Sequence, residues 1–247
     1  MPSIRSSPIL IFCGLLLLHG AAAQDRKSDA TFYQEILSNT YKSYVTQAGD
    51  NIRLYNGTEY ARPYNGISGH PFFDTNSFQK GTVYFDGTQY RDVLMAYDMV
   101  GDELIIKAYQ DLSLKLVTEK ITSFYFSDHL FVRIVQDSNS NNLQTGFYEI
   151  LNTGPVLALV KRKKIIERPL RAEDPFKFSE YDSYFLKKDD VYYPIDSRNS
   201  LISVFHEYKN EIKIFLRKNK LNFKKDRANT LIKTVGYYTQ LKNNYAK

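Results

Sequence analysis

Cysteine is almost absent from this chain, which has a single one, Cys13. The chain also has no tryptophan. Cys13 falls in an apolar run near the start, so the remaining sequence has no thiol for a disulfide, a zinc–thiolate site or a cysteine nucleophile. Small secreted animal domains commonly need disulfides for stability. Their absence therefore favours a bacterial envelope protein whose core is large enough to fold unaided.

Apolar runs long enough to cross a membrane are also lacking. The run Ile9–Leu18 is about half of the roughly 20 residues that a spanning helix needs. It follows the cation Arg5 and precedes Ala21 and the Ala23–Gln24 junction, in the order typical of a Sec-type signal peptide. We therefore predict a signal peptide over residues 1–23, cleaved near that junction. The mature chain is then exported to the periplasm or the extracellular space and has no transmembrane segment.

Several well-known catalytic motifs are missing too. The sequence contains no HExxH zinc motif, no GxSxG serine elbow, no GxxxxGK[ST] phosphate loop and no GxGxxG turn. Paired carboxylates for glycoside cleavage have a spacing set by the fold, and no pair is singled out here. The sequence therefore predicts no catalytic residue, no metal site and no cofactor, and it favours a protein that is not an enzyme.

Charge is moderately basic and mixed, with 33 lysines and arginines against 27 acids. Cations gather in two clusters, one at Arg217–Lys225 and one made of Lys161, Arg162, Lys163 and Lys164. Lysine-rich turns commonly do no more than keep a protein soluble and protect sheet edges. The alternative is an anionic surface partner, such as lipid head groups or an acidic glycan. Nucleic acid is not expected for an exported chain.

What the sequence does have is an alternating pattern broken by regular turns between residues 81 and 195. Asp86, Asp102, Asp111 and Asp128 fall where the segments reverse, and an aspartate there can bond to its own backbone. The gaps are too short for crossover helices, so the segments predict an antiparallel meander. We expect an α+β fold with a curved sheet or partial barrel of about 9–11 strands over residues 52–195.

The acids between residues 84 and 106 also invite a metal-site interpretation. A calcium loop needs acids at alternate positions within about a dozen residues and a glycine at the sixth, a spacing that this segment does not have. Asp92 and Asp98 fall on one predicted strand, too far apart to share an ion. We therefore interpret the acids as turn and strand residues.

Helical periodicity marks both ends of the mature chain. An apolar stripe predicts an N-terminal helix within residues 24–48. A second helical region, residues 196–247, predicts a two-helix hairpin packed on the sheet. Its stripe consists of Leu201, Phe205, Tyr208, Ile212 and Phe215, then Ala228, Leu231, Ile232, Val235, Tyr238 and Leu241. Residues 24–247 are expected to form a single domain.

Tyrosine is abundant, with 20 in the chain, and several tyrosines fall in the irregular segment between residues 52 and 79. Loops held by a rigid sheet often carry binding sites. The candidate lining of a groove for a sugar or peptide is Tyr55, Tyr60, Tyr64, Asn65 and His70. The alternative is that these aromatic residues only cap an open end of the sheet.

Some stretches resemble small uncharacterised secreted proteins of bacterial envelopes. They are "YNGTEY", "GHPFF", "GTVYFDGTQYRDVLMAYDM", "GFYEILNTG" and "FLRKNKLNFKKDRANTLIKTVGYY". The resemblance spans most of the mature chain. It implies export and a single unit of sheet with terminal helices, and it implies no activity.

The combined expectation is an exported, non-enzymatic envelope protein. It would be a binding or structural accessory module for a protein partner or for an anionic glycan or lipid. One alternative is a carrier that holds an apolar ligand between the sheet and the helices. The other is a hydrolase with its site near His70. The oligomeric state is not predicted.

Overall fold

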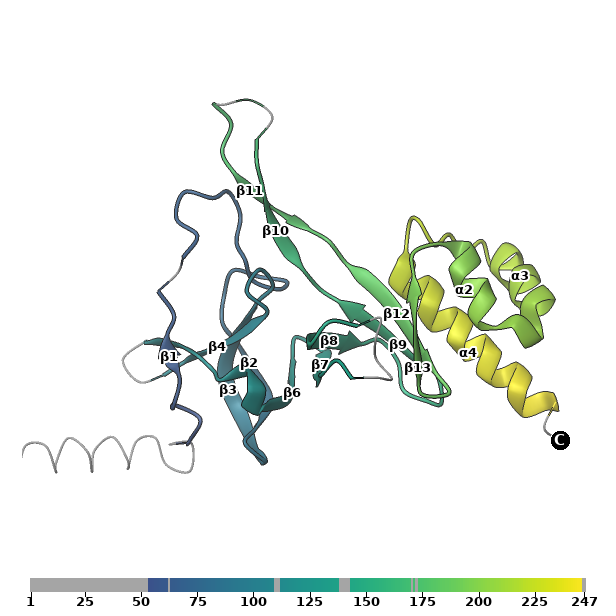
Figure 1. Ribbon diagram of the computed structural model, residues 1–247, viewed down its shortest axis with the longest axis horizontal. Helices are drawn as coiled ribbons and strands as arrows, with labels where there is room; N and C mark the ends of the chain where they lie inside the picture. Colours follow the sequence, from purple (N-terminus) through teal and green to yellow (C-terminus); the bar gives the residue numbers. More distant parts are fainter. Residues whose placement is uncertain are drawn as a thin grey trace, which may run out of the picture. The chain divides into compact units, whose positions relative to one another are not determined.

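Eleven strands form one antiparallel sheet in a computed structural model of the chain (Figure 1). The structure describes residues 53–245 except 62, 109–111, 138–142, 170 and 172. The predicted signal peptide and N-terminal helix lie outside these residues. The strand order is β1-β5-β4-β3-β2-β6-β7-β8-β9-β12-β13, and the sheet does not close on itself. The antiparallel sheet is thus confirmed, as an open sheet.

The strands follow one another closely along the chain. They are β1 (Thr58–Glu59), β2 (Gln79–Phe85), β3 (Thr88–Asp98), β4 (Glu103–Lys107), β5 (Ser113–Lys115), β6 (Ile121–Phe126), β7 (His129–Ile134), β8 (Gly146–Ile150), β9 (Leu157–Lys161), β10 (Lys164–Glu167), β11 (Lys177–Glu180), β12 (Ser183–Lys188) and β13 (Val191–Ile195). The helices are α2 (Arg198–Val204), α3 (Lys209–Lys218) and α4 (Arg227–Tyr245).

Aspartates occupy the reversals, as the sequence predicts. Asp86, Asp102 and Asp128 have φ angles of 50°, 58° and 63°, in the left-handed region that aspartate tolerates better than most residues. Asp111 lies outside the described residues. Asp92 is different, because it has a φ of 55° within β3 itself. The pairing of β3 with β2 shifts register beside it, so Asp92 is an irregularity of the strand and not a regular strand residue.

Side chains alternate between the two faces of the sheet and feed different cores. Phe124, Phe131 and Phe147 from β6, β7 and β8 are fully buried in one cluster, with the rings of Phe124 and Phe131 stacked at 4.9 Å. On β9, Val160 packs under the helices, whereas its neighbour Leu159 packs on the opposite face. This two-residue period places one face of β9, β12 and β13 beneath a helical layer.

The helical layer consists of the three helices α2, α3 and α4, where the sequence predicts a hairpin of two (Figure 1). Helix α2 begins with a capping box between Ser197 and Ser200 and ends at Val204, with Phe205 as its C-cap; His206–Tyr208 then form a 3₁₀ turn. A 3₁₀ turn repeats every three residues, so the apolar stripe runs through the break without an obvious interruption. The buried Phe205 packs at 4.5 Å on the ring of Tyr238 in α4.

A second correction concerns the chain after β9. The sequence from Val156 to Ile166 looks like one strand, but β9 ends at Lys161 and β10 begins at Lys164 in a separate two-stranded sheet with β11. The segment 166–180, which contains Pro169 and Pro175, therefore includes β11. Among the helices of the described part of the chain, none has the length and apolar character to cross a membrane.

Candidate functional site

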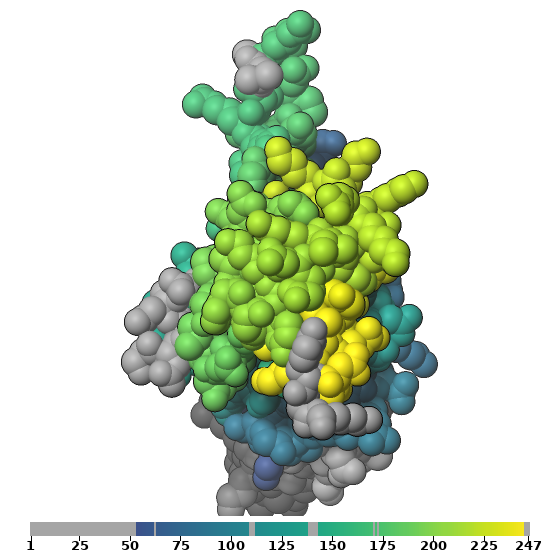
Figure 2. All heavy atoms as spheres, turned by 90° about the vertical axis from the view of Figure 1, so that its right-hand side faces the viewer, coloured from purple at the N-terminus to yellow at the C-terminus, as the bar shows by residue number. Residues whose placement is uncertain are grey.

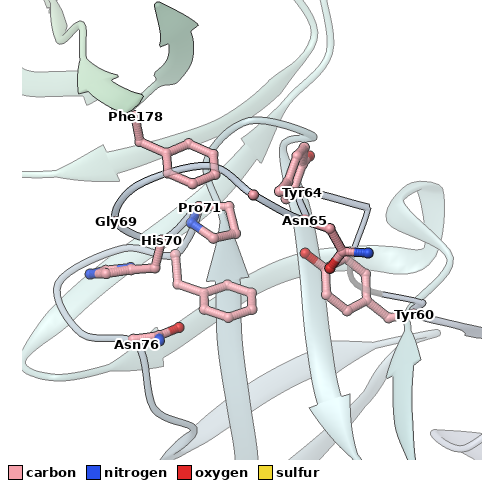
Figure 3. A pocket seen from close by; sticks show the side chains of 10 residues that line it. Tyr60, Tyr64, Asn65, Gly69, His70, Pro71, Asn76 and Phe178 are labelled. Carbon is pink, nitrogen blue, oxygen red and sulfur yellow. The ribbon is translucent and has the colours of Figure 1, made fainter. Parts of the chain in front are cut away.

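A pocket of about 190 Å³ lies between the loop after β1 and strand β11 (Figure 3). It is lined by Tyr60, Tyr64, Asn65, Gly66, Gly69, His70, Pro71, Phe72, Asn76 and Phe178. Four of the five predicted groove residues, Tyr60, Tyr64, Asn65 and His70, are among these. The fifth, Tyr55, packs against the core cluster of β2–β8 instead.

A fully buried carboxylate holds the tyrosine side of the pocket. The Tyr60 hydroxyl donates a hydrogen bond of 2.7 Å to Asp98 Oδ2. Asp98 Oδ1 accepts from the backbone N–H groups of Val100 at 2.8 Å and Gly101 at 3.1 Å. One aspartate therefore caps the β3–β4 turn and fixes the ring of Tyr60 at the same time.

The titratable side chains of the pocket are uncharged at neutral pH. Burial, followed by the hydrogen bond to Asp98, raises the pKa of Tyr60 well above its usual range. Burial and the nearby Asp98 carboxylate likewise raise the pKa of Tyr64. Burial, followed by the positive charge of Lys164, lowers the pKa of His70 below its ordinary value of 6.5. The tyrosine side of the pocket is therefore neutral, and His70 adds no charge to the lining.

Backbone hydrogen bonds fasten the pocket loop to the main sheet. The Phe73 N–H donates to the carbonyl of Tyr97 at 2.8 Å, and the Met99 N–H donates to the carbonyl of Pro71 at 3.0 Å. The loop residues on either side of Phe72 are thus bonded to the end of β3. A loop tied in this way holds its side chains in fixed positions, as a binding site requires.

The opposite wall comes from the separate β10–β11 sheet. The Ser68 N–H donates to the carbonyl of Phe176 at 2.8 Å, and the Phe178 N–H donates to the carbonyl of Ser68 at 3.2 Å. The Phe178 ring meets Tyr64 edge to face, with ring centroids 5.6 Å apart. Figure 3 shows Phe178 above the pocket and Tyr60 and Tyr64 on one side of it.

Lys164, at the start of β10, ties the two walls together. Its side chain is 7 % exposed, and Nζ donates to the carbonyl oxygens of Phe72 at 2.7 Å and His70 at 3.2 Å. Glu180 on β11 lies 3.4 Å from the same ammonium group. The sequence places His70 and Lys164 in two separate candidate sites. In the structure they are in contact, because the Lys164 ammonium group bonds to the carbonyl of His70.

His70 has an arrangement that does not suit a general base. Its Nδ1 is buried and makes no well-aligned hydrogen bond within the described residues, although the nearby backbone of Phe72 partly offsets the lowering of the His70 pKa. Figure 3 shows its imidazole directed to the opposite side of Pro71 from Tyr60 and Asn65. A catalytic histidine is normally oriented by a partner on its second nitrogen. The hydrolase alternative stays a prediction that this geometry does not favour.

The basic cluster Lys161–Lys164 does not form a single charged surface. Lys161 Nζ lies 2.5 Å from Asp102, and Arg162 pairs with Asp182 and, at 2.6 Å, with Glu149. The Lys164 ammonium group is bonded to the carbonyl groups of His70 and Phe72 in the pocket loop. Among these four cations only Lys163 is exposed. As a site for an anionic partner, the cluster therefore offers one free cation.

Lys161 and Lys163 line a second pocket of about 410 Å³ next to the β3–β4 turn. The Asp102 carboxylate there accepts hydrogen bonds from the Tyr97 hydroxyl at 2.5 Å and from Lys161. Gly146, with a φ of 153°, leaves room for this ion pair, because a Cβ atom would overlap both Asp102 Oδ2 and Lys161 Nζ. The charges of Asp102 and Lys161 thus neutralise each other, and Lys163 leaves one exposed cation at this pocket.

Sequence reasoning missed Asp98, Asn76 and Phe178. The position of Asp98, directly before the Val100–Gly101–Asp102 turn, is the signal for a turn-capping aspartate. No comparable signal marks Phe178, because it reaches the pocket only through β11, some 110 residues along the chain from Tyr64. The sequence carries no sign of a contact between segments so far apart.

Among the residues that the structure describes, no group of three or more histidine, cysteine and acidic side chains could hold a metal ion. Comparisons of the chain with models of protein families, with curated proteins and with solved structures found no match.

Proposed function

We propose that this chain is an exported, non-enzymatic binding module that holds one neutral sugar ring of a glycan in the pocket of Tyr60, Tyr64, Asn65 and Phe178. The observation that carries the proposal is the separation of charges from the lining. The side chains that line the pocket are uncharged, whereas Asp98 and Lys164 lie behind them and position them.

A neutral ligand follows from this electrostatic arrangement. An anionic ligand would need a cation that faces it, but the Lys164 ammonium is directed to the carbonyl groups of His70 and Phe72. A cationic ligand would need an exposed carboxylate, but Asp98 is fully buried and bonded to Tyr60. Burying an uncompensated charge is costly, so a neutral group is favoured over both.

A sugar ring fits the mixture of surfaces in the pocket. The aromatic walls of Tyr60, Tyr64, Phe72 and Phe178 suit the apolar C–H face of such a ring. The exposed amide of Asn65, together with Asn76, provides donors and acceptors for its hydroxyl groups. The volume of about 190 Å³ is below the ~300–1,000 Å³ typical of sites for drug-sized ligands, so a single ring at the end or edge of a glycan is preferred.

The carrier alternative has less support. Buried side chains from β9, β12 and β13 and from all three helices fill the interface where such a carrier would place its ligand. They include Tyr184, Leu186, Phe205, Leu216, Phe223 and Tyr238. The alternative remains a prediction that these contacts do not favour.

The test is saturation-transfer NMR and calorimetry with a panel of neutral monosaccharides and oligosaccharides and their uronic-acid counterparts. We expect a neutral saccharide to bind better than its uronic-acid counterpart. The Asn65→Ala and Tyr64→Ala variants should each weaken binding about tenfold, because one removes a hydrogen-bonding amide and the other removes an aromatic wall.

The matched control is Tyr84→Ala, which removes an exposed tyrosine on β2 that does not line the pocket. Its affinity should equal that of the wild type. The proposal fails if no neutral saccharide binds, or if Tyr64→Ala and Tyr84→Ala weaken binding equally.

A further inference from the structure

Positive charge is concentrated in the helical layer. Between Arg198 and Tyr245 the sequence has 11 lysines and arginines against three acids, a formal net charge of +8, whereas the whole chain carries only +6. The rest of the chain is therefore slightly acidic. Glu207, Glu211 and Asp226 are the three acids, and Glu207 is already paired with Lys188 of β12 at 2.7 Å.

The cations of this layer are exposed, and within the described residues they have no ionic partner. Six of them, which we call the basic face, lie on α3 and on the turn that joins it to α4: Lys213, Arg217, Lys218, Lys220, Lys224 and Lys225. All six are exposed. Within the described residues, the lysines and arginines of α2, α3, α4 and the turns between them form no salt bridge. In Figure 2, side chains at the yellow-green end of the layer project into solvent.

The turn that carries the basic face is rigid. Helix α3 ends with a hydrogen bond of 2.9 Å from the Leu221 N–H to the carbonyl of Leu216, which closes a Schellman-type cap. Phe223 is 3 % exposed in the core beneath, and Asn222 Oδ1 accepts from the Lys224 N–H at 3.0 Å. The backbone that carries these charges is therefore already ordered before binding, so that only the side chains lose freedom when they dock.

Lys220 occupies a backbone position that normally favours glycine. It has a φ of 53°, at the residue where a Schellman cap usually has glycine. A non-glycine residue in this conformation strains the backbone. A lysine here instead of glycine adds an exposed cation at the tip of the turn in spite of the strain.

An apolar side chain lies among these cations and favours a bilayer over a soluble polyanion. Ile214 on α3 is 54 % exposed and has Lys213 beside it, with Arg217 and Lys218 one helical turn further on. A polysaccharide has no apolar layer to receive such a side chain. At a bilayer, cations remain at the head groups while an apolar side chain enters the interface.

We propose that the basic face docks on the head-group layer of a bilayer that contains anionic lipid, with Ile214 entering the interface. The basic face is on the helical layer, which packs on β9, β12 and β13, whereas the proposed sugar pocket lies beside β3 and β11. The two sites use different residues, so one can fail without the other.

The test is a flotation assay with the protein as the cell produces it. One set of vesicles contains phosphatidylglycerol and phosphatidylcholine, and the other contains phosphatidylcholine alone. We expect binding only to the anionic vesicles, with a steep loss between low and physiological salt. The Lys218→Gln/Lys220→Gln/Lys224→Gln variant should bind about 100-fold more weakly. Ile214→Gln should bind about fivefold more weakly.

The matched control, Lys80→Gln/Lys163→Gln/Lys242→Gln, removes three exposed lysines elsewhere and changes the net charge equally. It should keep most of the vesicle binding, because position and not total charge decides the docking. The N-terminal region is the same in all variants, so the comparison isolates the basic face. Tyr64→Ala, which disables the sugar pocket, should bind vesicles like the wild type.

Equal loss in the two triple variants would overturn the proposal, as would binding that is indifferent to salt or absent. Binding to a soluble acidic polysaccharide without binding to anionic vesicles would overturn it too, and would assign the basic face to a glycan instead.

Discussion

The sheet and the helical layer use lysine and arginine in opposite ways. In the sheet region, Lys161, Arg162 and Lys164 are largely buried and bonded to carboxylates or carbonyl groups. In the helical layer, Lys218, Lys220 and similar cations are exposed and have no ionic partner in the described structure. The first group stabilises contacts between segments, and the second group is available to a partner.

A run of lysines and arginines in a sequence therefore does not by itself indicate whether the cations are paired inside the protein or exposed to a partner. Residues 161–164 and 217–225 are both rich in lysine and arginine. The first run lies where β9 ends and β10 begins, and its side chains point to alternate faces. The second run lies at the end of α3 and on the exposed turn after it. Alternation sends neighbouring charges to opposite faces, where acids from distant segments meet them. A helix end and its turn expose the charges together.

Displacing the Asp102–Lys161 ion pair should have the largest effect. Gly146→Ala places a Cβ atom against Asp102 and Lys161, which are bonded at 2.5 Å. We expect the free energy of unfolding to fall by about 2–3 kcal/mol, because the added methyl group displaces two bonded charged groups and strains the backbone at a positive φ. Urea denaturation measures the change.

Gly154→Ala is the matched control, because its φ is 134° and no atom lies within 4 Å of the added Cβ. It should cost about 1 kcal/mol, from backbone strain alone. Equal losses in the two variants would mean that strain, and not the ion pair, determines the effect at Gly146.

Removing the buried ammonium behind the pocket should have the next largest effect. Lys164→Met leaves the carbonyl groups of Phe72 and His70 without their donor, so we expect a loss of about 2 kcal/mol in the free energy of unfolding. The substitution also removes a positive charge that lowers the pKa of His70. The pKa of His70, measured by NMR titration, should therefore rise.

Lys163→Met, which changes the exposed neighbour, should alter the free energy of unfolding by less than about 0.5 kcal/mol and leave the pKa of His70 in place. If the two methionine variants prove equally stable, Lys164 does not hold the pocket loop.

The smallest expected effect concerns the one acid of the helical layer that is paired with the sheet. Burial would raise the pKa of Glu207, but hydrogen bonds from Lys188, the backbone and Tyr238 outweigh it and lower the pKa to about 2. A lowered pKa contributes stability that is present above the unfolded-state value of about 4.5 and is lost as the pH falls towards 2.

The stability gap between the wild type and Glu207→Gln should therefore narrow by about 1 kcal/mol between pH 5 and pH 2, a modest value because solvent screens a carboxylate that is 32 % exposed. Thermal denaturation across this range measures it. A gap that stays constant with pH would show that the charge of Glu207 is not what stabilises the contact with Lys188.

Local patterns were sufficient to predict most of the sheet. Asp86, Asp102 and Asp128 mark reversals because their side chains tolerate left-handed backbone, and alternating polarity gives each strand its inward face. The break between β9 and β10 escaped prediction, because apolar and β-branched residues lie on both sides of it. The third helix escaped because a 3₁₀ turn preserves the apolar spacing.

The sequence predicts the part of the candidate site that lies on one loop, but not the part that distant segments contribute. Tyr60, Tyr64, Asn65 and His70 share one loop, so their proximity follows from the chain itself. Phe178 and Lys164 join them only through long-range pairing, with Lys164 reaching a carbonyl 94 residues away along the chain. No local pattern encodes such a contact, and the roles of Lys161 and Arg162 were hidden for the same reason.

The most direct measurement is a residue-by-residue NMR map of the ¹⁵N-labelled chain during titration with a neutral oligosaccharide. The account predicts that the amide signals of Tyr64, Asn65, Asn76 and Phe178 shift together, whereas those of Lys218, Lys220 and Lys224 do not move. Shifts confined to α3 and the turn after it, or an undisturbed loop after β1, would contradict the account.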